Sequence, residues 1–181
     1  LAGERGEGAR LLAIDDLGRA HDCDVLLDQN LQPESDDRYA GRVPAGCIRL
    51  LGPRHALLRA EFAQAHRRAR VREGGVRRML VFLGGMDAGN ATEPVLHAVA
   101  SACPADVAVD VVVGANHPAL ARIQALVAAR RDARCYVQTT GMMDLLAAAD
   151  FAIGAGGTAT WERCALGVPT LALCIADNQR E

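Results

Sequence analysis

The feature that most constrains the fold is a regular alternation of apolar runs and amphipathic segments from residue 77 onward. The apolar runs are rich in valine, leucine and isoleucine and most end at glycine or polar residues, as buried strands do. The expected strands are 78–83, 107–113, 135–137, 151–153 and 169–175. Helices are expected after Asn90, which could cap the first of them, after Pro118, and over 142–149 and 158–166. Five strands that alternate with four helices predict an α/β fold with a parallel, doubly wound sheet and right-handed crossovers.

Residues 1–72 follow a different pattern. Strands are expected at 10–14, 25–27 and 48–51, with no long helix between them until an arginine-rich helical stretch at 54–70, which we interpret as a solvated face. Glu73-Gly-Gly75 has the composition of a linker. We therefore expect a boundary near residues 70–77, with residues 1–72 forming the end of one domain and 73–181 most of a second.

Composition narrows the class of protein. The chain has 20 basic residues, all arginine, against 22 acidic residues, and this near balance argues against a nucleic-acid partner. Half of the residues are hydrophobic, which excludes a disordered chain. The six cysteines are scattered without a C-x-x-C pair and indicate reduced thiols in a cytoplasmic protein. The most apolar stretch, 145–157, contains Asp150 and is too short to cross a bilayer. Because the chain begins at Leu1, we expect it to be a fragment of a longer protein.

Three loops are expected at one edge of the second sheet, where ligands bind in open parallel sheets. They are 84–90, 154–158 and 176–179. Glycines there allow a ligand close to the backbone, and helix N termini offer N–H groups to an anion. Thr158 adds a hydroxyl, and Glu162, one turn further along the helix, could accept hydrogen bonds from both hydroxyls of a ribose. Together these features predict a pocket for a nucleoside diphosphate.

Simpler interpretations remain for the same residues. The glycines could form ordinary turns, Glu162 could favour the positive end of its own helix, and Asn178 and Gln179 could be surface residues. Neither glycine loop is a Walker A or a G-x-G-x-x-G sequence. Two acidic pairs, Asp15-Asp16 and the D-x-D sequence Asp22-Cys-Asp24, are typical of turns at strand ends.

The histidines carry no metal-binding spacing, so we expect neither a metal nor another cofactor. His117 is the one histidine expected at the same sheet edge as the glycine loops and merits a test. The chain has no G-x-S-x-G nucleophile elbow, and no cysteine has an obvious histidine partner.

Several motifs occur in a familiar order. They are Ile14-Asp-Asp16, His21-Asp-Cys-Asp-Val-Leu-Leu-Asp-Gln-Asn30, Leu51-Gly-Pro-Arg-His-Ala-Leu-Leu-Arg-Ala-Glu-Phe62, Leu83-Gly-Gly-Met-Asp87, Ile153-Gly-Ala-Gly-Gly-Thr158, Trp161-Glu162 and Ala176-Asp-Asn-Gln179. Over nearly the whole chain this set resembles the UDP-sugar hydrolases of pseudaminic acid biosynthesis, which release UDP from UDP-2,4-diacetamido-2,4,6-trideoxy-β-L-altrose. The glycine loops are shared with other nucleotide-sugar enzymes of the GT-B class, including the lipid II-forming N-acetylglucosaminyltransferase.

The resemblance implies two Rossmann-like domains in a GT-B arrangement, the first incomplete and the second nearly complete, with the substrate between them. It implies that UDP is bound by Gly84, Gly85, Asp87, Asn90, Gly156, Gly157, Thr158, Glu162 and Gln179. In this family water attacks the anomeric carbon without a metal. Asn178 maps onto an asparagine that supports catalysis, whereas the base histidine of a G-x-G-H motif and a further tyrosine are absent from this chain.

The resemblance therefore assigns a binding half to these residues, and we expect the fragment itself to be inactive. A monomer is plausible. The alternatives are a GT-B glycosyltransferase, in which an acceptor hydroxyl replaces water, and a non-catalytic nucleotide-binding module.

Overall fold

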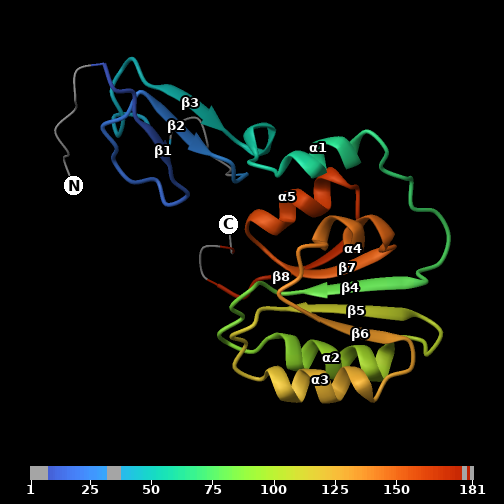
Figure 1. The fold of residues 1–181 in the computed structure, drawn as a ribbon. Helices are drawn as coiled ribbons and strands as arrows, with labels where there is room; N and C mark the ends of the chain where they lie inside the picture. The colour runs from blue at the N-terminus through green and yellow to red at the C-terminus, as the bar shows by residue number, and fades with distance from the viewer. Residues whose placement is uncertain (1–7, 32–37, 177–178, 180–181) are drawn as a thin grey trace. The chain divides into compact units, whose positions relative to one another are not determined.

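The computed structural model describes residues 8–31, 38–176 and 179 (Figure 1). It divides the chain into two compact units, and the division falls between Leu57 and Leu58. Each unit contains a sheet whose strands all run parallel. The α/β class with parallel sheets is therefore as expected, and it is consistent with a Rossmann-like fold.

The first unit is built on a three-stranded sheet in the order β1-β2-β3. Its strands are β1 (Leu12–Ile14), β2 (Val25–Asp28) and β3 (Ile48–Leu51). Leu26 and Tyr39 are fully buried and form the core of this unit with Cys23. All three strands coincide with the apolar runs that predicted them, because each run supplies the side chains that pack in this core.

The second unit contains a five-stranded sheet in the order β6-β5-β4-β7-β8. Its strands are β4 (Arg78–Phe82), β5 (Ala108–Val113), β6 (Ala133–Val137), β7 (Phe151–Ala155) and β8 (Thr170–Leu173). All five predicted strands are present. The order reverses at β4, because the chain first adds β5 and β6 on one side of β4 and then returns to add β7 and β8 on the other.

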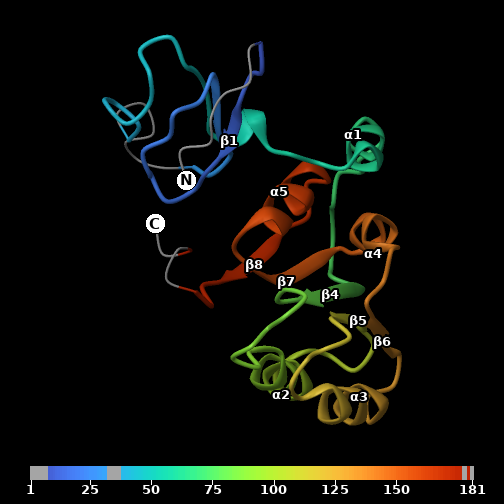
Figure 2. The same ribbon diagram turned by 60° about the vertical axis from the view of Figure 1, so that its left-hand side comes forward.

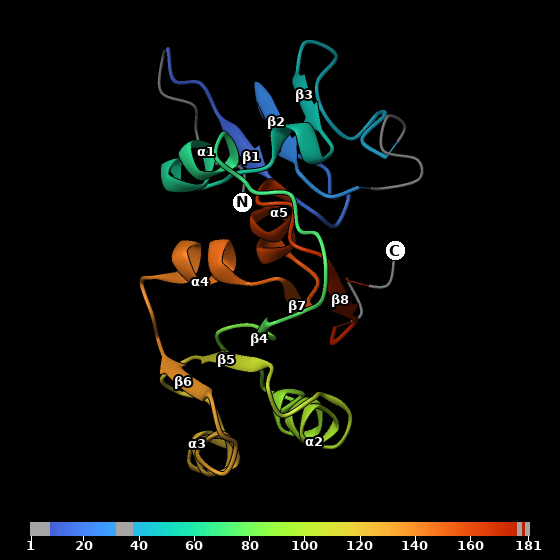
Figure 3. The same ribbon diagram turned by 90° about the vertical axis from the view of Figure 1, so that its right-hand side faces the viewer.

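Helices cover both faces of this sheet, as the views in Figures 2 and 3 show. One face carries α2 (Thr92–Ala102) and α3 (Leu120–Ala128). The other carries α4 (Met142–Ala148) and α5 (Thr158–Ala165), and α1 (Ala60–His66) packs against both of these. All four helices predicted between the strands are therefore present.

The side chains of β5 show how one strand contributes to two cores. Val109, Val111 and Val113 pack into the core beneath α2 and α3, whereas Val112 packs with α4. Successive residues of a strand point to opposite faces, so a run of valines buries both sides of the sheet. Asp110 interrupts the run, but it is buried in an ion pair with Arg78, whose Nη1 lies 2.7 Å from the carboxylate.

The prediction of one solvated helix over 54–70 is wrong. A 3₁₀ turn (Pro53–His55) comes first, the backbone is extended at Ala56 and Arg59, and the α-helix covers only α1. Phe62 in α1 is fully buried in the core of the second unit. The helix therefore packs with the second unit, and the contacts divide the chain earlier than the boundary expected at 72/73.

The segment between α1 and the expected linker at 73–75 is bound to the second unit by two arginines. Arg72 donates to the carbonyl oxygens of Ala149 at 2.8 Å and Leu146 at 3.0 Å, at the end of α4. Arg70 pairs with Asp150 at 2.6 Å. Burial lowers the pKa of Arg72, with a further lowering by Arg70. These arginines are thus not simply a solvated face, because they satisfy carbonyl groups that the end of a helix leaves without partners.

Candidate functional site

The reversal of strand order brings two of the predicted loops together. β4 and β7 are neighbours, with Phe82 in register with Gly154, and the loops that follow them begin side by side. After β4 the chain continues into α2 on one face, and after β7 into α5 on the other. Such a switch point leaves a crevice at the carboxyl ends of the strands, which is the usual ligand position in this type of sheet.

Asp87 organises the loop after β4. Its Oδ1 accepts a hydrogen bond from the Ala91 N–H at 2.8 Å, and its Oδ2 accepts from the Thr92 N–H at 2.8 Å and the Thr92 hydroxyl at 2.6 Å. Burial alone raises the pKa of the Asp87 carboxyl group, but the hydrogen bonds from Thr92, His117 and Ala91 outweigh burial and hold this pKa below its usual range. The side chain is 1% exposed and its oxygens accept hydrogen bonds from the protein, so it shapes the loop from within.

Asn90 does not cap α2, contrary to expectation. The cap is provided by Asp87, and the Asn90 side chain instead donates a hydrogen bond to Glu93. Both Asp87 and Asn90 have positive φ angles, 32° and 51°, which are uncommon for residues other than glycine. Such dihedral angles are energetically unfavourable. The four hydrogen bonds that the Asp87 carboxylate accepts compensate for this cost.

His117 lies beneath the same loop. Its Nε2 lies 3.0 Å from Asp87 Oδ2, and its Nδ1 accepts a hydrogen bond from the Ala119 N–H at 3.1 Å. Because Nδ1 is an acceptor, the ring proton resides on Nε2 and points at Asp87. His117 is 5% exposed and both ring nitrogens are occupied, so its place at the sheet edge gives it a structural role and not that of a base.

Gly114 presses against this loop from the end of β5. A Cβ atom at position 114 would lie 1.8 Å from the carbonyl oxygen of Gly85. No side chain fits there unless the backbone of one loop moves. Gly114 therefore allows the ends of β4 and β5 to approach closely, a role that the sequence pattern of a strand followed by glycine did not reveal.

The second glycine loop joins β7 to α5. Gly157 precedes the helix with φ 97°, a conformation that favours glycine. Gly157 and Thr158 are exposed, whereas Gly154 and Ala155 are buried. The first N–H groups of α5 thus lie at an open turn, where an anion could accept hydrogen bonds from them.

Arg163, in the last turn of α5, was not singled out from the sequence. It is 4% exposed, and its Nη2 donates to the Ala155 carbonyl oxygen at 2.7 Å and to Thr160 Oγ1 at 3.1 Å. Burial lowers the pKa of this guanidinium group. Gly154 leaves the space that the group occupies, since a Cβ there would lie 2.4 Å from Nη1.

Glu162 lies on the same side of α5 as Thr158, as the spacing of four residues predicts. Its side chain is 15% exposed, and Oε1 lies 3.4 Å from Nη2 of Arg59, which immediately precedes α1. Arg59 also pairs with Glu61 at 2.9 Å. A carboxylate has further lone pairs, so the contact with Arg59 orients Glu162 without using all of its acceptor capacity.

The third loop meets the second through Gln179. The Gln179 Nε2 lies 3.4 Å from the Gly156 carbonyl oxygen, and its Oε1 accepts from the Ile175 N–H at 3.0 Å. A Cβ on Gly156 would lie 3.0 Å from the Gln179 side chain, so Gly156 allows this approach. Asn178, the predicted catalytic residue, lies outside the described residues.

A polar cluster at the carboxyl ends of β1 and β2 was also missed. The Tyr39 hydroxyl lies 3.0 Å from Asp15 Oδ2 and 2.9 Å from Asp28 Oδ2, and all three residues are buried. Burial raises the pKa of Asp15, but the backbone and guanidinium of Arg19, with Tyr39, lower it more, so that this pKa is about 2. Burial and both carboxylates raise the pKa of Tyr39. The Tyr39 hydroxyl thus links the two carboxylates, so the cluster holds this edge of the first unit together.

Asp24, in the D-x-D sequence, accepts a hydrogen bond from the Leu11 N–H at 2.7 Å, which joins the starts of β1 and β2. This contact agrees with the structural interpretation of that motif. Among the described residues no group of three histidine, cysteine, aspartate or glutamate side chains is placed to hold a metal ion.

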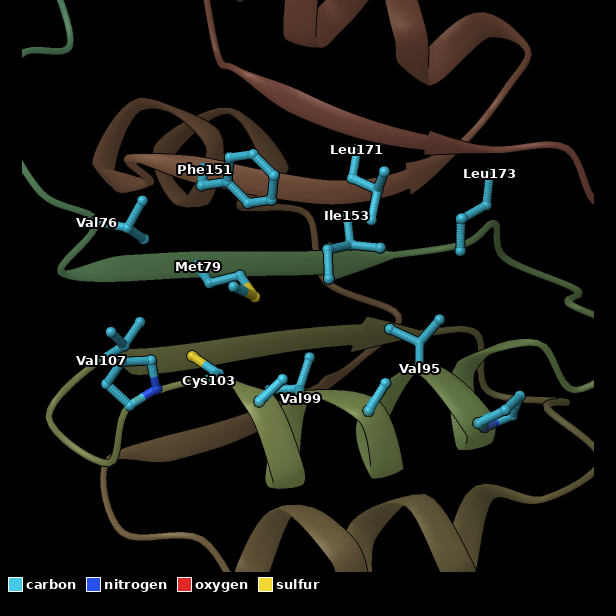
Figure 4. Close-up of a pocket in the computed structure, with 14 residues that line it drawn as sticks. Val76, Met79, Val95, Val99, Cys103, Val107, Phe151, Ile153, Leu171 and Leu173 are labelled. Atoms are coloured by element: carbon cyan, nitrogen blue, oxygen red, sulfur yellow. The ribbon is translucent and has the colours of Figure 1, made fainter.

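A cavity of about 720 Å³ lies on the α2 face of the sheet (Figure 4). Residues of α2, β7 and β8 line it, including Val95, Val99, Ile153 and Leu173. The lining is apolar apart from the thiol of Cys103, so it offers no donors for a phosphate and differs in character from the glycine loops. Within the described ranges no helix is both long and apolar enough to cross a membrane.

The chain was compared with protein families and with curated proteins. No family model matches the chain. A curated relative from Campylobacter jejuni, the UDP-2,4-diacetamido-2,4,6-trideoxy-β-L-altropyranose hydrolase, is 25% identical over 172 residues. The chain is similar to a UDP-sugar hydrolase. The match covers 95% of this chain and spans about 60% of the length of the relative.

Proposed function

We propose that this chain provides the UDP-binding part of a GT-B hydrolase that releases UDP from UDP-2,4-diacetamido-2,4,6-trideoxy-β-L-altrose. The observation that carries the proposal is the pairing of β4 with β7, which sets two glycine loops side by side at the switch point of the sheet. The similarity to the Campylobacter hydrolase supports the choice of a UDP-sugar over other nucleotides. The proposal includes metal-independent hydrolysis, as the resemblance implies, and a cytoplasmic protein, as the scattered cysteines indicate.

In this proposal each loop holds one part of UDP. The diphosphate accepts hydrogen bonds from the exposed turn at Gly157 and Thr158, and Gly156 leaves room for it. Glu162 accepts hydrogen bonds from the ribose hydroxyls. The loop after β4 contacts the ligand through its backbone at Gly84, Gly85 and Asn90, while the bound carboxylate of Asp87 keeps that loop in shape.

The proposed reaction breaks the bond between the anomeric carbon and the diphosphate oxygen as water attacks that carbon. Negative charge accumulates on the leaving diphosphate in the transition state. Fixed N–H groups at the α5 N terminus then stabilise the transition state more than the ground state. Asn178 is assigned the role of orienting the sugar or the water, and Gln179 that of supporting the turn at Gly156.

The direct test of the site is calorimetry with UDP and 2′-deoxy-UDP on the wild-type chain and on Glu162→Ala. If Glu162 binds the ribose, the substitution weakens UDP binding by roughly tenfold and removes the preference for UDP over the deoxy form. Glu61→Ala is the matched control, because Glu61 pairs with the same arginine but lies on α1. Equal affinity of wild type and Glu162→Ala for UDP would exclude the ribose role.

The reaction is tested on a full-length protein that includes this chain. We expect UDP release from the amino-sugar nucleotide in water alone, and a larger loss of turnover than of UDP binding in Asn178→Ala. Equal losses would make Asn178 a binding residue only. Release that depends on an added acceptor alcohol would identify a glycosyltransferase, and no release from any amino-sugar nucleotide would identify a binding module.

A further inference from the structure

Arg163 is a buried cation that forms no salt bridge with any of the described residues. Among the described residues its side chain forms hydrogen bonds to one carbonyl oxygen and one hydroxyl, and its buried Nε has no hydrogen-bond partner there. The adjacent acid, Glu162, lies 3.4 Å from Arg59, and its charge offsets only part of the effect by which burial lowers the pKa of Arg163. A buried charge is costly unless an opposite charge or a full set of hydrogen bonds compensates it. Within the described part of the chain, no salt bridge therefore compensates the positive charge that this unit buries at Arg163.

The Arg163 guanidinium lies on the buried side of the turn between β7 and α5. Ala155, which accepts from Nη2, directly precedes Gly156 and Gly157, and Thr160 lies in the first turn of α5. The Gly157 turn is at most about 7 Å of backbone from Ala155. The guanidinium thus lies on the buried side of the same turn whose exposed side presents the N–H groups of the helix.

We propose that Arg163 is a positioning residue that makes this turn selective for a multiply charged anion, here the diphosphate of UDP. The inference rests on the proposed nucleotide site. The helix terminus supplies about half a positive charge, and the guanidinium adds a full charge that the protein interior screens less than water does. A diphosphate at the turn compensates both charges, whereas a neutral nucleoside compensates neither. Arg163 contributes in this way without touching the ligand.

The test compares Arg163→Met with Arg163→Lys, and uses Arg131→Met as a control. Arg131 precedes β6 and has a side chain that is 91% exposed, so it alters net charge equally without lying beneath the turn. Calorimetry of the whole chain measures affinity for uridine, UMP, UDP and pyrophosphate at several salt concentrations. The single tryptophan, Trp161, provides a fluorescence signal from α5 as a second readout.

We expect Arg163→Met to weaken UDP and pyrophosphate binding by about tenfold and to leave uridine binding unchanged. UDP binding should also become less dependent on salt, and Arg163→Lys should retain most of the affinity because it keeps the charge. Arg131→Met should change none of these values by more than about twofold, because an exposed charge is screened by solvent.

Three results would overturn the inference. The first is unchanged affinity of Arg163→Met for UDP. The second is an equal loss of affinity for uridine and for UDP in Arg163→Met, which would indicate a purely structural role. The third is a loss of UDP affinity in Arg163→Lys as large as that in Arg163→Met. Should Arg163→Met fail to fold, the lysine variant and the wild-type ligand series decide the matter. Wild type that binds pyrophosphate but not UDP would refute the proposed nucleotide site and leave the anion inference standing, whereas wild type that binds neither would refute both.

Discussion

Replacement of Asp87 by alanine should destabilise the second unit strongly, because one carboxylate holds three structural features together. It caps α2 through two N–H groups, binds the Thr92 hydroxyl and accepts the Nε2 proton of His117. Loss of a helix cap costs about 1–2 kcal/mol. A buried ring N–H left without an acceptor costs about 1–3 kcal/mol more. The expected decrease in the free energy of unfolding is therefore about 3 kcal/mol.

Urea unfolding followed by circular dichroism measures this decrease. Asp106→Ala is the control, since Asp106 is an exposed acid in the turn before β5, and its replacement should change the free energy of unfolding by less than about 0.5 kcal/mol. Asp87→Asn separates charge from shape, because the amide keeps one oxygen acceptor but lacks the negative charge. A cost below about 1 kcal/mol for Asp87→Ala would show that the reasoning about the cap and His117 is wrong.

The pH dependence provides a second check on the same carboxylate. The pKa of Asp87 in the folded chain lies below its usual value. The unfolded state therefore binds the proton more tightly, so the stabilisation is complete above the unfolded pKa of about 3.9 and is lost as pH falls through the folded pKa. The difference in free energy of unfolding between wild type and Asp87→Ala should thus shrink below about pH 4. A difference that grew on acidification would contradict the assigned hydrogen bonds.

Three further predictions concern other parts of the chain. Gly114→Ala should lower the free energy of unfolding by about 2 kcal/mol and weaken UDP binding, because the new methyl group would collide with the Gly85 carbonyl oxygen. Urea unfolding and calorimetry test this, with Gly89→Ala as the control, since a Cβ at position 89 has no atom within 4 Å. Asp15→Asn should cost about 2 kcal/mol at pH 7, since the pKa of Asp15 is about 2 when folded, and this cost should vanish as pH falls from about 5 toward 2. A cost independent of pH would oppose that assignment. A thiol reagent at pH 8 should modify the exposed Cys164 and Cys174 first and Cys23 last. The reason is that burial, reinforced by Cys47, raises the pKa of Cys23 to about 11. Peptide mapping gives the order of labelling, and early labelling of Cys23 would refute the prediction.

The positions of the strands and of most helices in the second unit could be predicted because they depend on local patterns. A run such as 107–113 is too apolar and β-branched to remain exposed, and glycine at position 114 ends it. The loops at 84–90 and 154–158 were predicted to share an edge because parallel strands all end there. Patterns failed at 54–70, where the arginines indicated one exposed helix. The α-helix covers only α1, and its Phe62 packs in the core of the second unit.

The sequence by itself determined the α/β fold class and the parallel sheets, and it indicated the residues of the proposed nucleotide site. Only the tertiary structure decided which loops are neighbours, because strand order depends on packing between segments far apart in the chain. The same holds for single residues: Asp87 meets His117 across 30 positions, and Arg163 is buried beneath the β7–α5 turn although a charged residue in a short helix is ordinarily exposed. Periodicity reports which face of an element is apolar, whereas the partners of a buried polar group follow only from the elements that pack around it.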